Sequence, residues 1–233
     1  MNALEETKIK LLAVDCLKSM KQHKTFRKLS SELALPAGVL NRYINGYVLP
    51  KKDRAEQLIA VFSKNYLPKL LESSRIKGSK YIVTTEILSQ PFLLTVIAYK
   101  AAQGFRGKAS VVLTAAVDGI PVANAIAGFL GIRCVYAKLT QEFSSTDHYV
   151  SRISGRKPVS SPFFLPKSLL KRSDSVLIAD DVIRAGTTFE ALTSICAQAR
   201  ANIAGIFAMF ITESALKELK KRHHVSYLEL VED

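Results

Sequence analysis

Residues 176–188, VLIADDVIRAGTT, carry the clearest structural pattern in this chain. Four apolar residues lead into the adjacent carboxylates Asp180 and Asp181, and a loop of small residues follows Arg184. An apolar run of this length predicts a buried strand of a parallel sheet, and a helical pattern begins directly behind the loop. Such sheets bind ligands at the carboxyl ends of their strands. The segment therefore predicts an α/β domain with a ligand site beside the two acids.

The residue types in this segment favour a sugar phosphate as the ligand. The carboxylates of Asp180 and Asp181 can accept hydrogen bonds from two vicinal hydroxyls of a ribose. Behind them, backbone amides, threonine hydroxyls and the positive end of the following helix make a phosphate site. A solvated strand end with a helix cap is the simpler alternative. It explains one acid, but it leaves the second acid and the glycine loop without a role.

Short apolar runs alternate with helical stretches from about residue 81 onward. The apolar runs are YIVTT, SVVLTAA, CVYAKL, SVLIAD, GIFAMFI and VSYLELV. The helical stretches between them are LSQPFLLTVIAYKAAQ, PVANAIAGFL, TTFEALTSICAQAR and SALKELKKR. This alternation predicts a mostly parallel sheet with flanking helices. Residues 140–165 are rich in Ser, Gly, Pro and charge and lack a clear period, so we expect a long functional loop there.

Two segments resemble one enzyme family. Residues 176–188 resemble the signature of type I phosphoribosyltransferases, which bind 5-phosphoribosyl 1-diphosphate (PRPP), and their spacing is close to that of an orotate phosphoribosyltransferase. Residues 110–132, SVVLTAAVDGIPVANAIAGFLGI, resemble the strand, pyrophosphate loop and following helix of the same family. The resemblance covers about residues 81–233 and implies the type I phosphoribosyltransferase fold for that region.

The resemblance also implies roles for the polar positions of these segments. Asp180 and Asp181 would hold the ribose hydroxyls. The 5-phosphate would lie against Ala185, Gly186, Thr187 and Thr188. A diphosphate site, filled together with Mg²⁺, would be formed by Ala116, Val117, Asp118, Gly119 and Lys138. The loop at residues 140–165 would close over the site and bring in Arg152, Arg156 and Lys157. Protein side chains alone are not expected to hold a metal ion.

Arg184 departs from the pattern of the catalytically active members. In those members the position usually holds a small or acidic residue: 6-oxopurine enzymes use an aspartate there, and orotate enzymes typically carry a threonine. Arginine offers no general base at neutral pH, because its pKa lies above about 12. The long loop also lacks the lysine motif on which orotate enzymes rely. We therefore expect Arg184 to modulate the base pocket, although it can also pair with a phosphate or with a substrate carboxylate such as that of orotate. No residue is assigned as catalytic.

The first third of the chain is helical in pattern and strongly basic. Apolar residues recur at three- and four-residue spacing up to the polar stretch ESSRIKGSK, so we place a domain boundary between residues 78 and 79. Of the net charge of +13, residues 1–80 contribute +9, from 16 Lys/Arg against 7 Asp/Glu. This excess favours a polyanionic partner, and nucleic acid before a membrane, because no strongly amphipathic surface helix with bulky apolar residues accompanies it.

Residues 25–50, TFRKLSSELALPAGVLNRYINGYVLP, have the pattern of a helix-turn-helix. A helix with Leu29, Leu33 and Ala34 facing inward breaks at Leu35-Pro36, and a second short helix ends at Gly46. The second helix would carry Val39, Leu40, Tyr43 and Ile44 on one face. The residues expected to contact bases or phosphates of DNA are Arg27, Lys28, Asn41, Arg42, Asn45, Lys51 and Lys52. A helical cap or a dimerisation module with a basic surface is the alternative.

The two predicted domains together are similar to archaeal orotate phosphoribosyltransferase-like transcription regulators, including those of glucose–fructose catabolism, and more loosely to the purine repressor of Gram-positive bacteria. This resemblance implies a homodimer that senses PRPP, a nucleoside monophosphate or a nucleobase without turnover. Two alternatives stay open. One is an active phosphoribosyltransferase for orotate or a purine base, a pentosyl-transferring enzyme of nucleotide metabolism with an accessory DNA-binding domain. The other is an interaction protein with a vestigial ligand site.

The location of the protein follows from what its apolar segments lack. No apolar run reaches the roughly 18 residues of a membrane span, and the first residues, MNALEETKIK, carry charge where a signal peptide has an apolar block. We therefore expect a soluble, cytoplasmic protein with no membrane partner.

Overall fold

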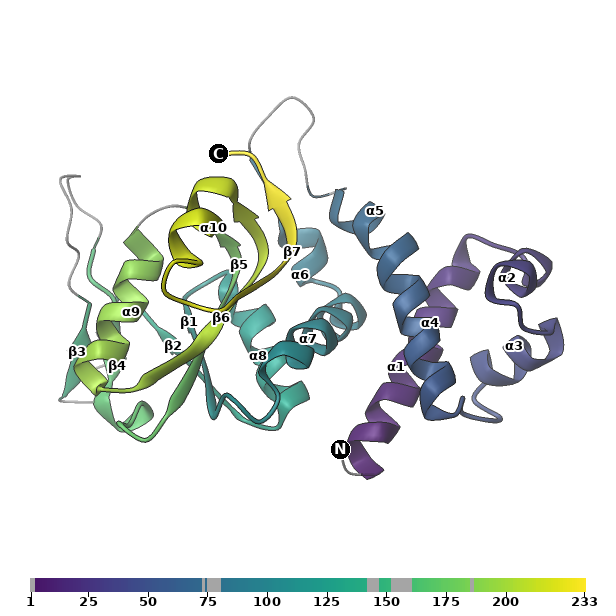
Figure 1. Ribbon diagram of the computed structural model, residues 1–233, viewed down its shortest axis with the longest axis horizontal. Coiled ribbons are helices and arrows are strands. Elements are labelled where there is room, and N and C mark those ends of the chain that lie inside the picture. Colours follow the sequence, from purple (N-terminus) through teal and green to yellow (C-terminus); the bar gives the residue numbers. More distant parts are fainter. Residues whose placement is uncertain (1–2, 73, 75–80, 142–146, 152–160, 185–186) are drawn as a thin grey trace. The chain divides into compact units, whose positions relative to one another are not determined.

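The computed structural model describes residues 3–72, 74, 81–141, 147–151, 161–184 and 187–233 of the chain (Figure 1). The chain divides into two compact units, Met1–Arg75 and Ile76–Asp233. The boundary predicted between residues 78 and 79 lies in the stretch 75–80, which is outside the described residues. Among the helices of the described ranges, none is long and apolar enough to cross a membrane.

The N-terminal unit consists of helices in the part that the structure describes. They are α1 (Ala3–Gln22), α2 (Phe26–Leu33), α3 (Ala37–Ile44), α4 (Lys52–Asn65) and α5 (Leu67–Glu72). The long helices α1 and α4 pack along each other, and α2 packs on α3. Leu17 and Met20 of α1 and Phe62 of α4 are fully buried. Leu29 of α2 and Leu40 of α3 are fully buried as well, and this burial holds the short helices in place, since helices of eight residues are not stable alone.

The turn between α2 and α3 agrees with the predicted break except at one residue. Thr25 caps α2, because its hydroxyl accepts a hydrogen bond from the Lys28 amide at 3.3 Å. Leu29 and Leu33 are buried as expected. The prediction that Ala34 faces inward is wrong: Ala34 is exposed, because it leaves the helix in the left-handed conformation with φ of 49°. This conformation reverses the chain and turns the Ala34 side chain away from the helix face.

A five-stranded parallel sheet forms the centre of the C-terminal unit. Its strands are β1 (Val111–Ala115), β2 (Arg133–Ala137), β5 (Ser175–Ile183), β6 (Asn202–Thr212) and β7 (Val225–Val231). They lie in the order β2-β1-β5-β6-β7, and every neighbouring pair is parallel. The order reverses between β1 and β5, which makes their carboxyl ends the switch point of the sheet.

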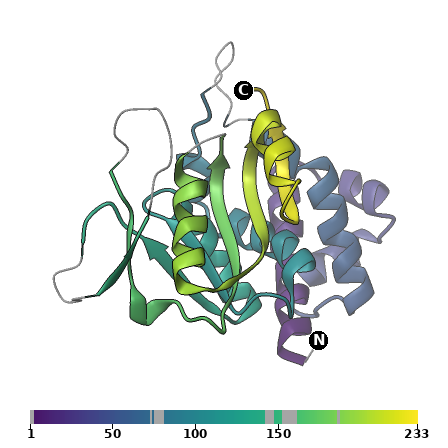
Figure 2. The same cartoon turned by 60° about the vertical axis from the view of Figure 1, so that its left-hand side comes forward.

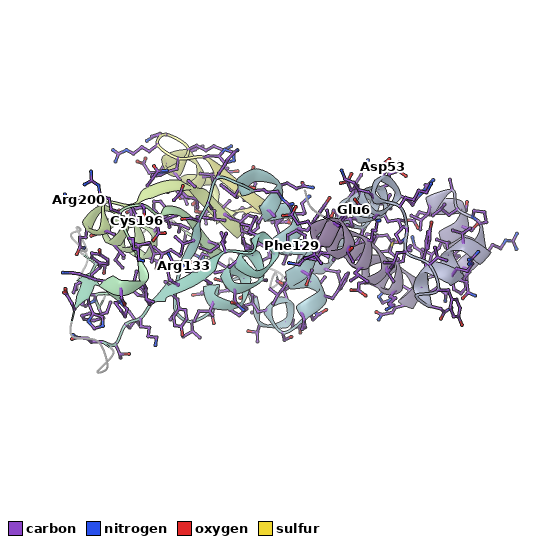
Figure 3. All side chains as sticks on the ribbon, turned by 90° about the horizontal axis from the view of Figure 1, so that it is seen from below. Glu6, Asp53, Phe129, Arg133, Cys196 and Arg200 are labelled. Atoms are coloured by element: carbon purple, nitrogen blue, oxygen red, sulfur yellow. The ribbon has the colours of Figure 1, made fainter. Side chains whose placement is uncertain are left out.

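Helices cover both faces of this sheet. They are α7 (Pro91–Phe105), α8 (Gly119–Leu130), α9 (Thr187–Ala199) and α10 (Glu213–Leu219). The connection through α8 leads from β1 to its neighbour β2 at one edge of the sheet. The connections through α9 and α10 lead from β5 to β6 and from β6 to β7, toward the other edge. Because such crossovers are right-handed, α8 lies on one face and α9 and α10 lie on the other (Figures 1 and 2). On the first face, Phe129 of α8, which Figure 3 labels, lies with its ring edge-on to that of Tyr99 of α7, with ring centroids 5.8 Å apart.

Two local predictions for this unit are wrong. The apolar run YIVTT forms no strand, because Thr84 instead opens the short helix α6 (Thr85–Leu88), with the Leu88 amide donating to the Thr84 carbonyl at 2.9 Å. Residues 140–165 are not without regular structure. They contain β3 (His148–Val150) and the start of β4 (Phe164–Pro166), which pair antiparallel as a separate ribbon. A short 3₁₀ turn, η1 (Lys167–Leu169), follows β4.

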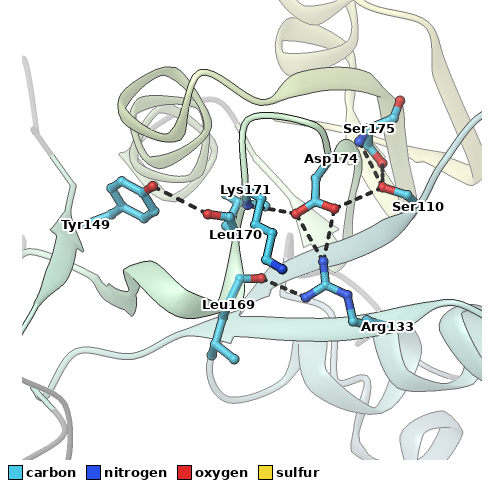
Figure 4. Close-up of polar contacts among 8 residues, drawn as sticks. All are labelled: Ser110, Arg133, Tyr149, Leu169, Leu170, Lys171, Asp174 and Ser175. Carbon is cyan, nitrogen blue, oxygen red and sulfur yellow. Dashed lines mark hydrogen bonds and ion pairs between the residues drawn. The ribbon is translucent and has the colours of Figure 1, made fainter.

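A polar cluster joins the amino ends of three strands at the edge of the sheet opposite the predicted site (Figure 4). The Arg133 guanidinium donates to both carboxylate oxygens of Asp174 at 3.0 Å and to the Leu169 carbonyl at 3.0 Å. Ser110 donates to Asp174 at 3.3 Å. Burial raises the pKa of Asp174, but hydrogen bonds from the Lys171 amide and from Arg133 outweigh this and hold that pKa below its usual value. The cluster ties β1, β2 and β5 to the turn that follows η1.

Candidate functional site

The two predicted ribose ligands lie next to each other near the carboxyl end of β5. Asp181 is 7% exposed and accepts a hydrogen bond from the Thr84 hydroxyl at 2.7 Å. The Asp181 amide donates to Oδ1 of Asp180 at 3.1 Å. Burial raises the pKa of Asp180 well above its usual value, and the carboxylates of Asp181 and Asp118 raise it further. The Asp180 carboxylate is therefore held where its charge is disfavoured, which is typical of functional sites.

Gly119 brings the second motif against this acid pair. It is the first residue of α8, directly after the loop that follows β1. A Cβ atom at this position would overlap Oδ1 of Asp180 and Oγ1 of Thr114, and it would lie 3.3 Å from Cγ of Asp180. Only glycine lets the backbone approach the carboxylate this closely. Two motifs that are far apart in the sequence therefore meet at one place, at the switch point of the sheet.

The loop between β1 and α8 is held against the end of β2. The Ala116 amide donates to the Ala137 carbonyl at 2.9 Å, and the peptide bond between Ala116 and Val117 is cis. Val117 is 74% exposed, and Asp118 is exposed as well. The predicted diphosphate loop is thus open to solvent beside Gly119, so its backbone is accessible to a ligand.

Lys138 follows β2 at the same edge of the sheet, because its neighbour Ala137 pairs with Ala115 of β1. Its backbone exchanges two hydrogen bonds with Phe164, at 3.0 and 2.7 Å, and its ammonium group lies 5.3 Å from the centre of the Tyr136 ring. These contacts attach the β3–β4 ribbon to the main sheet next to the loop. The predicted role of Lys138 in binding the diphosphate stays a prediction.

Several predicted residues fall outside the described part of the chain. They are Ala185, Gly186, Arg152, Arg156 and Lys157, and the side chain of Thr187. The backbone of Thr187 opens α9, and Thr188 is half-buried in its first turn. In the described residues, no group of three His, Cys, Asp or Glu side chains converges as a set of metal ligands.

Arg184 is exposed and lines a cavity of about 360 Å³ on the α9 and α10 face. The remaining lining residues are Ile183, Phe189, Glu190, Thr193, Ile203, Ala215, Glu218, Leu219, Arg222 and His223. The His223 ring stands edge-on to Phe189 at 5.8 Å, and burial, together with the Arg222 charge, lowers the pKa of His223. The sequence does not predict this cavity, because its residues come from α9, α10, two strands and the residues that follow β5 and α10, and they share no common motif.

Thr84 is the other residue of the site that sequence analysis missed. It lies 97 residues from Asp181 along the chain, in a run interpreted as a strand. No local signal distinguishes a threonine that caps a helical turn from one that donates to a distant carboxylate.

The predicted DNA-contacting residues lie on the two short helices of the N-terminal unit and just after them. Asn41 and Arg42 are exposed on α3, and Asn45 is exposed directly after it, whereas Leu40 is fully buried. The Asn45 side-chain amide donates to Oδ1 of Asn41 at 2.7 Å and to its backbone carbonyl at 2.9 Å, so the two amides are fixed side by side. The remaining predicted residues are Arg27, Lys28 and Lys51, which are exposed, and Lys52, which is half-buried and lies 4.0 Å from Glu56.

Known proteins similar to this chain include both regulators and enzymes. It is 34% identical over 159 residues to a probable purine biosynthesis transcriptional regulator PurR of Streptococcus pneumoniae, an alignment that covers 66% of this chain and 56% of the regulator. It is 30% identical over 174 residues to the purine biosynthesis transcriptional repressor PurR of Bacillus subtilis, covering 72% and 59% of the two chains. A xanthine phosphoribosyltransferase of Heliobacterium modesticaldum is 37% identical over 95 residues, which cover 40% of this chain and 50% of the enzyme. The chain thus spans little more than half the length of these relatives.

Among solved structures, an adenine phosphoribosyltransferase of Thermoanaerobacter pseudethanolicus has the same fold, with a TM-score of 0.59 at 14% identity over 70% of this chain and 98% of that one. The family model of the phosphoribosyl transferase domain matches residues 83–233, well over half of the chain. These residues contain both motifs, the acid pair and the parallel sheet. The chain therefore belongs to the phosphoribosyl transferase domain family and has the type I α/β fold of that family.

Proposed function

We propose that this protein is a transcription regulator whose phosphoribosyl transferase domain binds PRPP or a nucleotide and whose N-terminal helices bind double-stranded DNA. The observation that carries the proposal is the close approach of Gly119 to Asp180, which supports a preserved site for a ribose with a phosphate group. The basic excess of residues 1–80 and the names of the PurR relatives support the regulatory half of the proposal.

In the proposed site the acid pair receives the ribose. Asp180 and Asp181 accept hydrogen bonds from the two hydroxyls, and the exposed residues Val117 and Asp118 together with Gly119 offer backbone amides to the diphosphate. A Mg²⁺ ion would arrive with PRPP, and its charge would offset the burial and the neighbouring carboxylates that raise the pKa of Asp180. The parts assigned to Lys138, to residues 185–188 and to Arg152, Arg156 and Lys157 rest on the family resemblance and stay predictions.

In the proposed DNA-binding unit, α3 is the recognition helix of a helix-turn-helix. Buried Leu40 anchors it, and its outward face carries Asn41, Arg42 and Asn45. Arginine pairs with guanine and asparagine with adenine in the major groove. Arg27, Lys28 and Lys51 would contact phosphates. A homodimer would present two such helices to a palindromic site. The finer similarity to archaeal orotate phosphoribosyltransferase-like regulators rests on the sequence motifs alone.

Catalysis is the alternative, and the similarity to a xanthine phosphoribosyltransferase favours testing it directly. Arg184 opposes it, because a guanidinium cannot serve as a general base at neutral pH. The decisive assay is release of diphosphate from PRPP with Mg²⁺ in the presence of orotate, uracil, adenine, guanine, hypoxanthine or xanthine. We expect no turnover at rates typical of enzymes, about 1 per second or more. Turnover at such rates with any base would contradict a pure sensor.

DNA binding is tested by fluorescence anisotropy with a labelled duplex from the region upstream of the protein's own coding sequence. At low salt we expect specific binding that exceeds binding to a scrambled duplex of equal length. Equal affinity for both duplexes, or no binding to either, would contradict the regulatory half of the proposal. Isothermal titration calorimetry with PRPP and Mg²⁺, and with nucleoside monophosphates, tests the other half, and absence of binding to all of them would contradict it.

A further inference from the structure

The hydrogen bond from Thr84 to Asp181 joins two distant parts of the C-terminal unit. The Thr84 hydroxyl donates to Oδ2 of Asp181 at 2.7 Å, and both residues are only 7% exposed. A carboxylate can accept about four hydrogen bonds. This donor occupies one acceptor position and restrains the rotation of the Asp181 side chain. The bond therefore sets which of the remaining oxygen lone pairs a ligand can reach.

The position of Thr84 in the chain gives this bond a second consequence. Thr84 is nine residues beyond Arg75, the last residue of the N-terminal unit. Its carbonyl also accepts the hydrogen bond from the Leu88 amide that begins α6. Thr84, which lies among the first described residues of the C-terminal unit, is thus bonded directly to one member of the acid pair before the chain continues into α7.

We propose that Thr84 is a positioning residue of the ribose site and that, through it, ligand occupancy at Asp181 reaches the segment joining the two units. This inference rests on the proposed function. A ribose hydroxyl that donates to Asp181 shares the carboxylate with Thr84, so the strength and geometry of the Thr84 bond differ between the free and the bound site. A contact that differs between two states is what a ligand needs in order to shift an equilibrium elsewhere in the protein.

The test compares full-length Thr84→Val, which keeps the shape of the side chain and removes its donor, with Thr84→Ser, which keeps the donor. The matched control is Thr95→Val on α7, which makes the same chemical change at an exposed site where the hydroxyl bonds the Pro91 carbonyl at 2.9 Å. PRPP affinity is measured by calorimetry with Mg²⁺, and DNA affinity by anisotropy with and without saturating PRPP. Thermal unfolding shows that each variant is folded.

We expect Thr84→Val to weaken PRPP binding about tenfold or more, because a hydrogen bond to a charged group is lost. We also expect it to abolish the effect of saturating PRPP on DNA affinity. Thr84→Ser should restore both properties to within about twofold, and Thr95→Val should behave as wild type. A Thr84→Val protein with wild-type PRPP affinity, or with the full PRPP effect on DNA, overturns the inference. If the wild type itself does not bind PRPP, PRPP is not the ligand of the proposed function, and the inference fails with it.

Discussion

Replacement of Gly119 by alanine is expected to damage the stability of the C-terminal unit and its ligand site together. The added Cβ would overlap oxygens of both Asp180 and Thr114, and Thr114 is fully buried and has no room to retreat. Overpacking of this kind costs about 1–3 kcal/mol. The matched control is Gly128→Ala in the same helix, where a Cβ meets nothing within 4 Å. Alanine is favoured over glycine inside a helix by about 0.5–1 kcal/mol, so the control should be slightly stabilised.

The two variants should therefore differ by about 1.5–4 kcal/mol in the free energy of unfolding. At about 2–4 °C per kcal/mol, thermal unfolding should separate their midpoints by at least about 3 °C, with Gly119→Ala below wild type and Gly128→Ala at or above it. Because the Asp180 carboxylate must move, calorimetry should also show loss of PRPP affinity in Gly119→Ala only. If Gly119→Ala unfolds at the wild-type temperature and binds PRPP normally, then α8 does not approach Asp180 as described.

Three further predictions concern charged side chains. Asp180 has a pKa raised above its unfolded value of 3.8, so the stability that it contributes is present below pH 3.8 and is lost as the pH rises through the folded pKa. Asp180→Asn should therefore raise the unfolding temperature more at pH 7 than at pH 4. Equal shifts at the two pH values would refute this. Asp174 has a lowered pKa, so Asp174→Asn should lower the free energy of unfolding by about 1–3 kcal/mol at pH 7, and this loss should shrink as the pH falls below 3.8. Lys167→Ala breaks an exposed ion pair of 2.8 Å, and in the same denaturation assay it should lower the free energy of unfolding by less than about 1 kcal/mol. In anisotropy titrations, Arg42→Ala should lose about 1–3 kcal/mol of DNA-binding free energy and relax specificity at one base pair. Lys28→Ala should weaken binding to all DNA sequences alike and lower the slope of log affinity against log salt concentration by about 1. Identical behaviour of the two variants would contradict the assigned contacts.

Much of the fold follows from patterns that are local in the sequence. The run that contains Asp180 and Asp181 is a buried strand, and the helix behind it begins at Thr187 as expected. Predictions failed where a few residues decide the structure. YIVTT has the composition of a strand, but its last residue begins the short helix α6, whose Leu88 amide donates to the Thr84 carbonyl. Strands β3 and β4 have only 3 residues each, too few to show a period of two.

The site was predictable as a set of motifs and not as an arrangement in space. Residues 176–188 and 110–132 each suggested a role, but spacing along the chain carries no information on distance in the fold. That Gly119 lies against Asp180 follows from β1 and β5 being neighbours in the sheet, which only the structure supplies. The Thr84 hydrogen bond and the cavity beside Arg184 depend on contacts between distant segments, so no local pattern in the sequence predicts them.

In the proposed function, the acid pair and the DNA-binding helices belong to one regulated protein. The most direct measurement is the DNA affinity of the wild type and of the double variant Asp180→Asn/Asp181→Asn, each titrated with PRPP and Mg²⁺. Coupling free energies between two sites are typically 1–3 kcal/mol, so PRPP should change the wild-type DNA dissociation constant by about fivefold or more and leave that of the double variant unchanged. A PRPP effect of equal size in both proteins, or none in the wild type, would contradict the account.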